Sequence, residues 1–133
     1  MSSRKILLVD DEPHVVRLLR LVLEREGYCV ETANDGHEAL ARLEHYDPHV
    51  IISDIQMHGM DGRELCRILR QRYPSRACLI IVMTSMTAMD ERSWVKDLTN
   101  TEFCEKPLSP RQLVARLNAY FAALPCQPEL HRE

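Results

Sequence analysis

Acidic side chains follow two short apolar segments of the sequence. Asp10 and Asp11 come directly after a run of Ile, Leu and Val, and Asp54 comes after a second such run and one serine. Thr84 and Lys106 follow two further segments that we predict to be strands. If all four segments are parallel strands of one sheet, these side chains meet at the carboxyl edge, where open α/β sheets bind ligands. The sequence thus predicts three carboxylates, a hydroxyl and an ammonium in a small volume.

The chemistry of such a cluster follows from its charge. Two carboxylates about 4 Å apart repel by about 4 kcal/mol at an effective dielectric of about 20, and Lys106 offsets one charge at most. The excess favours a hard divalent cation, and oxygen ligands indicate Mg²⁺, which leaves room for a phosphoryl oxygen. A carboxylate beside Mg²⁺ can attack phosphorus and form an acyl phosphate, while Lys106 and Thr84 contact the phosphoryl oxygens. A lone aspartate at a strand end is more often structural, so the interpretation depends on the whole set.

The pattern of apolar residues alternates strands and helices five times. We expect strands at 6–9, 28–33, 50–52, 79–83 and 101–105, and helices from Pro13, from about Gly36, and over about 62–72, 87–98 and 110–124. This alternation is typical of a parallel sheet with helices on both faces. We therefore predict an α/β fold with a five-stranded parallel sheet of order 2-1-3-4-5, doubly wound and flavodoxin-like, in a three-layer α/β/α sandwich.

Local signals predict where two of the helices begin and end. Asp11 is a good N-cap for the first helix, with Pro13 in its first turn, and Gly27 is expected to end it. Ser109 is expected to cap the last helix. Apolar residues recur at helical spacing in the first helix, at Val15, Val16, Leu18, Leu19, Val22 and Leu23.

Length and composition restrict the class of protein. The 133 residues, 45% of them hydrophobic, suggest one domain over 1–124 with a polar tail over 125–133. A net charge of −3 gives no case for binding nucleic acid or a membrane surface. We find neither a signal peptide nor an apolar run of about 20 residues, so we expect a cytoplasmic protein. The five cysteines are odd in number and scattered, as expected for reduced thiols.

Four motifs of the chain resemble the receiver domain of two-component response regulators, including the chemotaxis regulators. The resemblance covers roughly residues 4–124, and the order and spacing of the motifs agree with that family. The motifs are Ile6–Pro13, Ser53–Met57 with Gly59–Gly62, Thr84-Ser85 and Lys106-Pro107. The resemblance implies a protein that takes a phosphoryl group onto Asp54 from a partner histidine kinase or histidine phosphotransfer protein.

The resemblance also implies a role for each residue of the site. Mg²⁺ would be bound by Asp11 and Asp54, by Asp10 through water, and by the backbone carbonyl of Gln56. Thr84 and Lys106 would contact the phosphoryl group.

The resemblance further implies a conformational switch, in which Thr84 acts together with the aromatic residue Phe103. The phosphorylated state would then be reported to a partner by the surface from the helix expected at 87–98 through the strand at 101–105 to the last helix. That partner would be a downstream protein target or an output domain outside this sequence, and homodimerisation on phosphorylation stays open.

Departures from the family pattern keep two alternatives open. His58 stands where the family usually has Pro, and Thr99-Asn100 replace a small Gly-Ala pair. The change at His58, together with the unusual sequence of the helix expected at 87–98, motivates the first alternative, a scaffold with this fold whose partner binding does not depend on phosphorylation. The second is a Mg²⁺-dependent phosphatase with an aspartyl nucleophile. It is disfavoured because Gln56 stands where such enzymes carry a second Asp.

Overall fold

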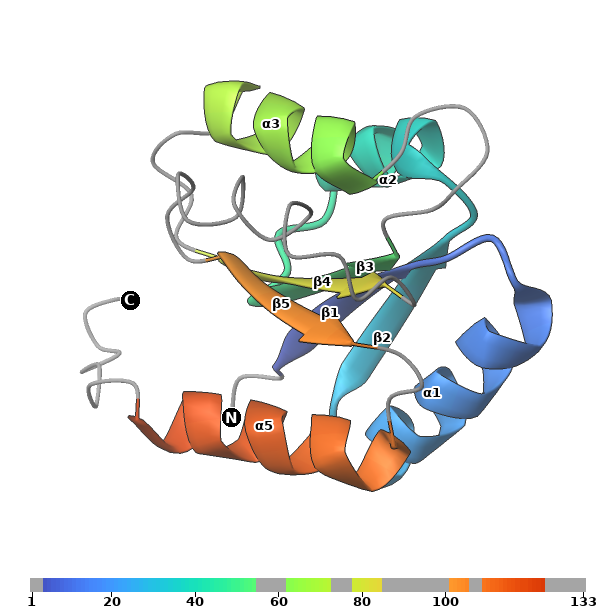
Figure 1. Cartoon of the computed structure of the whole chain (residues 1–133), viewed down its shortest axis with the longest axis vertical. Helices are drawn as coiled ribbons and strands as arrows, with labels where there is room; N and C mark the ends of the chain where they lie inside the picture. The colour runs from blue at the N-terminus through green and yellow to red at the C-terminus, as the bar shows by residue number, and fades with distance from the viewer. Residues whose placement is uncertain (1–3, 55–61, 73–77, 85–100, 106–108, 124–133) are drawn as a thin grey trace.

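The computed structural model describes residues 4–54, 62–72, 78–84, 101–105 and 109–123, and these residues form a single parallel sheet flanked by helices (Figure 1). The strands are β1 (Lys5–Val9), β2 (Cys29–Ala33), β3 (Val50–Asp54), β4 (Leu79–Thr84) and β5 (Thr101–Glu105). Their order is β2-β1-β3-β4-β5, and every pair is parallel. The predicted sheet is therefore confirmed.

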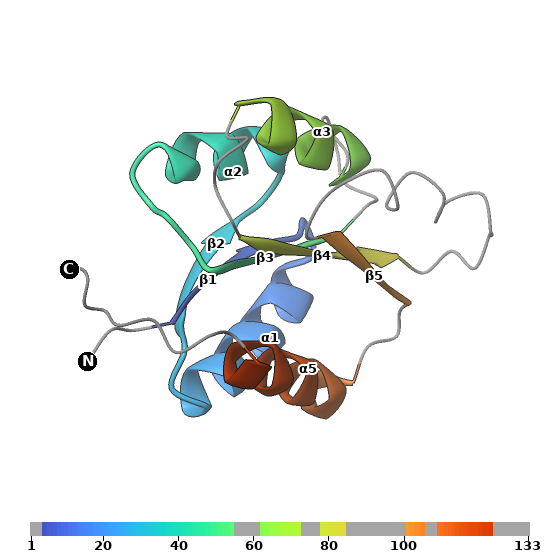
Figure 2. The ribbon, with the colours of Figure 1, turned by 90° about the vertical axis from the view of Figure 1, so that its left-hand side faces the viewer.

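The helices of the described residues cover both faces of the sheet. They are α1 (Pro13–Arg25), α2 (Gly36–Leu43), α3 (Gly62–Arg72) and α5 (Pro110–Ala123). Figures 1 and 2 show α1 and α5 on one face and α2 and α3 on the other. This arrangement confirms the three-layer α/β/α sandwich. The helix predicted at 87–98, and with it His58 and Thr99-Asn100, lies outside the described residues.

The core consists of two apolar layers, one on each side of the sheet. β1 contributes to both because successive strand residues point to opposite faces. Strands buried on both faces read as continuous apolar runs, which is why β1, β3 and β4 were evident from the sequence. The layer beneath α1 and α5 includes Ile6, Leu8, Leu19, Leu23, Leu113 and Leu117. The layer beneath α2 and α3 includes Leu7, Val9, Leu40, Leu43, Leu65 and Leu69.

The start of α1 differs from the prediction. Its N-cap is Glu12, which is extended and makes no capping hydrogen bond through its side chain, and Pro13 is the first helical residue. The prediction of Asp11 as N-cap is therefore wrong. Asp11 lies one residue too early for that role, and its carboxylate belongs to a cluster of acidic groups described below.

The apolar face of α1 is narrower than its sequence suggests. Leu19 and Leu23, one turn apart, are buried, whereas Leu18 is 50% exposed. Successive helical residues point about 100° apart, so a helix centred on Leu19 and Leu23 turns Leu18 toward solvent. Leu18 therefore fits the helical spacing of the apolar residues but lies off the buried face of α1.

Other predicted helix ends are confirmed. Gly27 follows α1 with a φ of 94°, a left-handed conformation that glycine adopts at little cost. At the start of α5, the Ser109 hydroxyl accepts a hydrogen bond from the backbone amide of Gln112 at 3.4 Å. Within the described part of the chain, none of the helices has the length and hydrophobicity that a membrane span requires.

Candidate functional site

The register of the sheet brings two aspartates next to each other. Val9 of β1 pairs with Ser53 of β3. Asp10 and Asp54 each follow one of these paired residues, so they occupy adjacent positions at the carboxyl edge. In doubly wound sheets, ligands bind outside the carboxyl ends of the strands where the strand order reverses, which here is between β1 and β3.

Three carboxylates converge at this edge, as the sequence predicted. One carboxylate oxygen from each of Asp10, Asp11 and Asp54 lies within 4.8 Å of the other two. Asp10 is 1% exposed and Asp54 is 5% exposed, while Asp11 is half-buried. We call these three residues the acid cluster.

Backbone hydrogen bonds hold Asp10 in place. Its amide donates to the carbonyl of Ala33, the last residue of β2, at 3.1 Å. Its Oδ1 atom accepts a hydrogen bond from the Glu12 amide at 3.0 Å, which closes a short turn before α1. Asp10 is therefore oriented from β2 on one side and from the start of α1 on the other.

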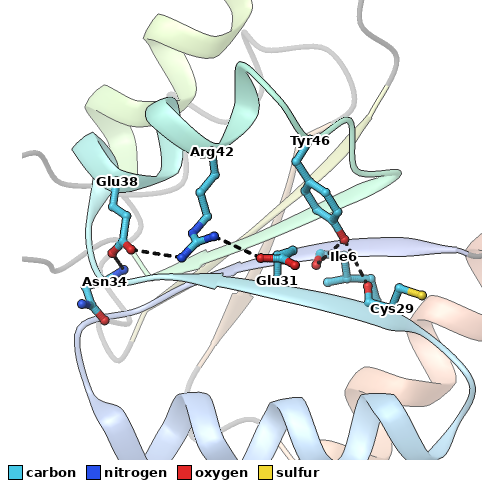
Figure 3. A network of polar contacts seen from close by, with 7 residues as sticks. All are labelled: Ile6, Cys29, Glu31, Asn34, Glu38, Arg42 and Tyr46. Atoms are coloured by element: carbon cyan, nitrogen blue, oxygen red, sulfur yellow. Dashed lines mark hydrogen bonds and ion pairs between the residues drawn. The ribbon is translucent and has the colours of Figure 1, made fainter.

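The end of β2 is in turn tied to α2 by the polar contacts of Figure 3. The backbone amide of Asn34 donates a hydrogen bond to Glu38 Oε1 at 2.7 Å. Arg42 pairs with Glu38 at 3.3 Å and with Glu31 of β2 at 3.1 Å. These ion pairs are exposed, and exposed pairs contribute at most about 1 kcal/mol each. Their contribution is to align α2 with the strand that receives the Asp10 amide.

Tyr46 makes a second connection on the same side of the sheet (Figure 3). Its hydroxyl donates toward the carbonyls of Ile6 and Cys29, at 3.4 and 3.3 Å. Burial, together with the negative charge of Glu31, raises the pKa of Tyr46 to about 12. The hydroxyl therefore remains a donor across the physiological pH range.

The acid cluster suits a divalent cation. Ionised carboxylates that lie within 4.8 Å of one another repel by at least about 3 kcal/mol per pair at an effective dielectric of about 20. All the donor atoms of Asp10, Asp11 and Asp54 are oxygens, and carboxylate oxygens suit hard cations such as Mg²⁺, Ca²⁺ and Mn²⁺. The charge and the donor type both fit a hard divalent cation bound at this edge.

Two further strands end at the same edge. Thr84 is the last residue of β4, and its backbone pairs with Glu105, the last residue of β5. Lys106 follows Glu105 in the sequence but lies outside the described residues, as does Gln56. Phe103 lies in β5 opposite Val82. The strand-end position of Thr84 is confirmed, whereas the roles expected of Thr84, Lys106, Gln56 and Phe103 stay predictions.

Two residues near the site were not singled out from the sequence. Asp35 caps α2, since its Oδ1 accepts from the Glu38 amide at 2.9 Å. The pattern of Asp35 followed by Glu three residues later is a capping signal and could have indicated this. Ser53 is fully buried, and its hydroxyl donates to the Asp54 carbonyl at 3.0 Å. A serine inside an otherwise apolar strand was the only signal for it.

Comparison with known proteins agrees with this geometry. The family model of the response regulator receiver domain matches residues 6–118. The chain belongs to this family. It is 40% identical over 120 residues to the alkaline phosphatase synthesis transcriptional regulatory protein PhoP of Bacillus subtilis, and 38% identical over 118 residues to the transcriptional regulatory protein ResD of the same organism. These matches cover 88% and 89% of the chain.

A solved receiver domain has the same fold. The chemotaxis protein CheY4 of Vibrio cholerae is 32% identical, with a TM-score of 0.82 and with 89% of this chain and 98% of that chain covered. By contrast, the matches to PhoP and ResD cover only 48% of those proteins, so this receiver domain spans about half the length of its curated relatives.

Proposed function

We propose that this receiver domain is switched by phosphorylation of Asp54. The observation that carries the proposal is the acid cluster, in which a buried Asp54 ends β3 within 4.8 Å of the carboxylates of Asp10 and Asp11. The receiver family membership supports the same chemistry. The proposed donor is a phosphohistidine on a histidine kinase or a histidine phosphotransfer protein.

The proposed step is a transfer between two nucleophiles. A carboxylate oxygen of Asp54 attacks phosphorus as the P–N bond to the donor histidine breaks. The electron pair of that bond stays on the imidazole nitrogen, and a protonated donor ring leaves as neutral imidazole. Asp54 then carries an acyl phosphate. The burial of Asp54 restricts the directions from which phosphorus can approach, which favours an aligned attack.

Mg²⁺ is the cation that we propose for the acid cluster. Asp11 and Asp54 would bind it directly, Asp10 through water, and Gln56 through its backbone carbonyl. When bound, Mg²⁺ neutralises negative charge on the phosphoryl oxygens. The three aspartates then have two tasks: they hold the cation, and one of them supplies the nucleophilic oxygen.

The proposed output is a population shift. Thr84 and Lys106 would contact the phosphoryl group, and Phe103 would change position with them. A phosphoryl group shifts such an equilibrium only by its differential interaction with the two states. The surface from residues 87–98 through β5 to α5 would report the state to a downstream protein or to an output domain outside this sequence. We place the receiver domain at 1–124 and the protein in the cytoplasm.

The test is phosphorylation of the purified chain by acetyl phosphate and Mg²⁺, followed by intact mass. We expect one added phosphoryl group on the wild type, none on Asp54→Asn, and one on Asp47→Asn, an exposed carboxylate used as the matched control. No added mass on the wild type would overturn the proposal. Sustained release of phosphate from a small phosphomonoester would instead indicate the phosphatase alternative. Partner binding that Asp54→Ala leaves unchanged would indicate the scaffold.

A further inference from the structure

Ser53 is a buried polar residue whose burial calls for an explanation. Among the described residues, the buried polar or charged ones are Asp10, Ser53 and Asp54, with exposed fractions of 1%, 0% and 5%. The two aspartates belong to the acid cluster, whereas Ser53 does not. All three lie at the carboxyl ends of β1 and β3, so Ser53 is buried directly beside the acid cluster.

The surroundings of Ser53 are apolar. Its neighbours in the register are Val9 on β1 and Val82 on β4. Residues paired in this way point to the same face of a sheet, and both valines belong to the core layer beneath α2 and α3. A valine would suit this position, because β-branched residues pack well on a pleated surface, whereas a buried hydroxyl costs free energy unless it is hydrogen-bonded.

The hydroxyl of Ser53 has a specific partner. It donates to the backbone carbonyl of Asp54 at 3.0 Å, in fully buried surroundings. Asp54 is the last residue of β3. Rotation about the Cα–C bond of Asp54 sets the position of this carbonyl, and the rotamers open to the carboxylate depend on the same backbone dihedrals. A hydrogen bond on the carbonyl therefore narrows the positions available to the carboxylate.

We propose that Ser53 is a positioning residue for Asp54, a role that rests on the function proposed above. Its hydroxyl holds the peptide group after Asp54, and so keeps the nucleophilic oxygen in the orientation that suits attack on phosphorus and binding of Mg²⁺. Such positioning lowers the barrier because the reactive geometry is present before the donor arrives. Ser53 itself contacts neither the donor nor the cation.

The test compares Ser53→Thr with Ser53→Val. Threonine and valine have nearly the same shape, so this pair differs only in the hydroxyl. The rate of phosphorylation by phosphoramidate at saturating Mg²⁺ is measured by intact mass, the dissociation constant of Mg²⁺ by titration, and stability by thermal unfolding. The matched control is Ile51→Val, which removes a methylene from the same face of β3, at a residue that is 1% exposed.

The expected result separates positioning from stability. Ser53→Val should lower the rate and weaken Mg²⁺ binding by about 5-fold, the effect of one neutral hydrogen bond, while its unfolding midpoint stays at or above that of the wild type. Ser53→Thr should keep both functional values within about 2-fold, since it retains the donor. Ile51→Val should lower the unfolding midpoint and leave both functional values unchanged.

Other results would contradict the positioning role of Ser53. A wild-type rate and Mg²⁺ affinity in Ser53→Val would overturn the positioning role, as would equal losses in the threonine and valine variants. If Ser53→Val does not fold, the hydroxyl contributes to stability instead, and the proposal fails. A wild type that binds Mg²⁺ but takes no phosphoryl group would refute only the proposed phosphorylation, and the Mg²⁺ affinities of the matched pair would then decide the role of Ser53.

Discussion

Asp10 and Asp54 lie on neighbouring strands, are almost completely buried, and have carboxylate oxygens within 4.8 Å of each other. At that distance two negative charges repel by about 3 kcal/mol at an effective dielectric of about 20. Repulsion between the two carboxylates is expected to lower the stability of the protein without a bound cation. Binding of a divalent cation is expected to restore that stability.

Replacing Asp10 with asparagine is expected to have opposite effects on stability and on Mg²⁺ binding. The amide oxygen of asparagine can still accept the hydrogen bond from the Glu12 amide. We expect Asp10→Asn to raise the stability of the Mg²⁺-free protein by about 1 kcal/mol, because the repulsion is relieved. We also expect it to weaken Mg²⁺ binding by about 10-fold or more, because a ligand charge is lost.

The measurement is thermal unfolding over a titration with Mg²⁺, because a ligand that binds only the folded state raises its stability with concentration. Glu26→Gln, which removes an exposed carboxylate, is the control and should behave as the wild type. A lower midpoint without Mg²⁺, or an undiminished response to Mg²⁺, would contradict the prediction.

The N-cap of α2 is expected to matter for stability. The Asp35 carboxylate accepts a hydrogen bond from the Glu38 amide at 2.9 Å. We expect Asp35→Ala to lower the free energy of unfolding by about 1 kcal/mol, as loss of an N-cap usually does. Urea unfolding measures the change. Asp35→Ser keeps an acceptor and should lose only a few tenths of a kcal/mol, so an equal loss in both variants would argue against capping.

Two leucines of α1 are expected to respond very differently to truncation. Leu23 is 0% exposed in the layer beneath α1 and α5, whereas Leu21 is 51% exposed. Leu23→Ala should cost about 2–5 kcal/mol through lost burial and the cavity that it leaves. Leu21→Ala should change stability by less than about 0.5 kcal/mol. Chemical unfolding of both variants gives the comparison, and similar losses would mean that α1 packs differently.

Acid is expected to destabilise the protein through His49. Burial, then the nearby positive charge of Lys5, lowers the pKa of His49 below 6.5 in the folded protein, and its Nδ1 accepts a hydrogen bond from the Lys5 amide at 3.0 Å. The unfolded chain therefore binds the proton more readily. Neutral His49 therefore contributes to stability above pH 6.5, and this contribution is lost as the pH falls through the lowered pKa.

The measurement is the free energy of unfolding between pH 7.5 and 5 in the wild type and in His49→Asn. Asparagine offers an acceptor in a similar position and does not titrate. Between pH 7.5 and 5, the free energy of unfolding of the wild type should fall with a slope that corresponds to uptake of less than one proton on unfolding. We expect His49→Asn to lack this part of the pH dependence. If both proteins show the same pH dependence, His49 does not carry the effect.

Much of the fold and the acid cluster of the site were open to prediction from the sequence. β1, β3 and β4 are buried on both faces, so each is a continuous apolar run that needs no tertiary information to find. Asp10, Asp11 and Asp54 follow such runs, and parallel strands bring their ends to one edge. The sheet order and the acid cluster were therefore predicted correctly.

Other features depended on contacts between distant residues. The sequence pattern of α1 includes Leu18, but only packing against the sheet selects Leu19 and Leu23 as the centre of its buried face. Asp11 resembles a helix cap by its residue type, but the meeting of β1 and β3 draws its carboxylate into the cluster. Local patterns indicate periodicity and propensity, and these do not determine which neighbour a side chain finally meets.

The sequence by itself determined the class of fold, the strand ends that carry the carboxylates and the kind of cation that they suit. Only the tertiary structure decided that Val9 and Ser53 stand opposite each other, that Ala33 receives the Asp10 amide, and that the Ser53 hydroxyl points to the Asp54 carbonyl. The reason is physical. The local sequence sets whether a segment forms a helix or a strand, whereas register and hydrogen-bond partners arise when strands distant in sequence pack together.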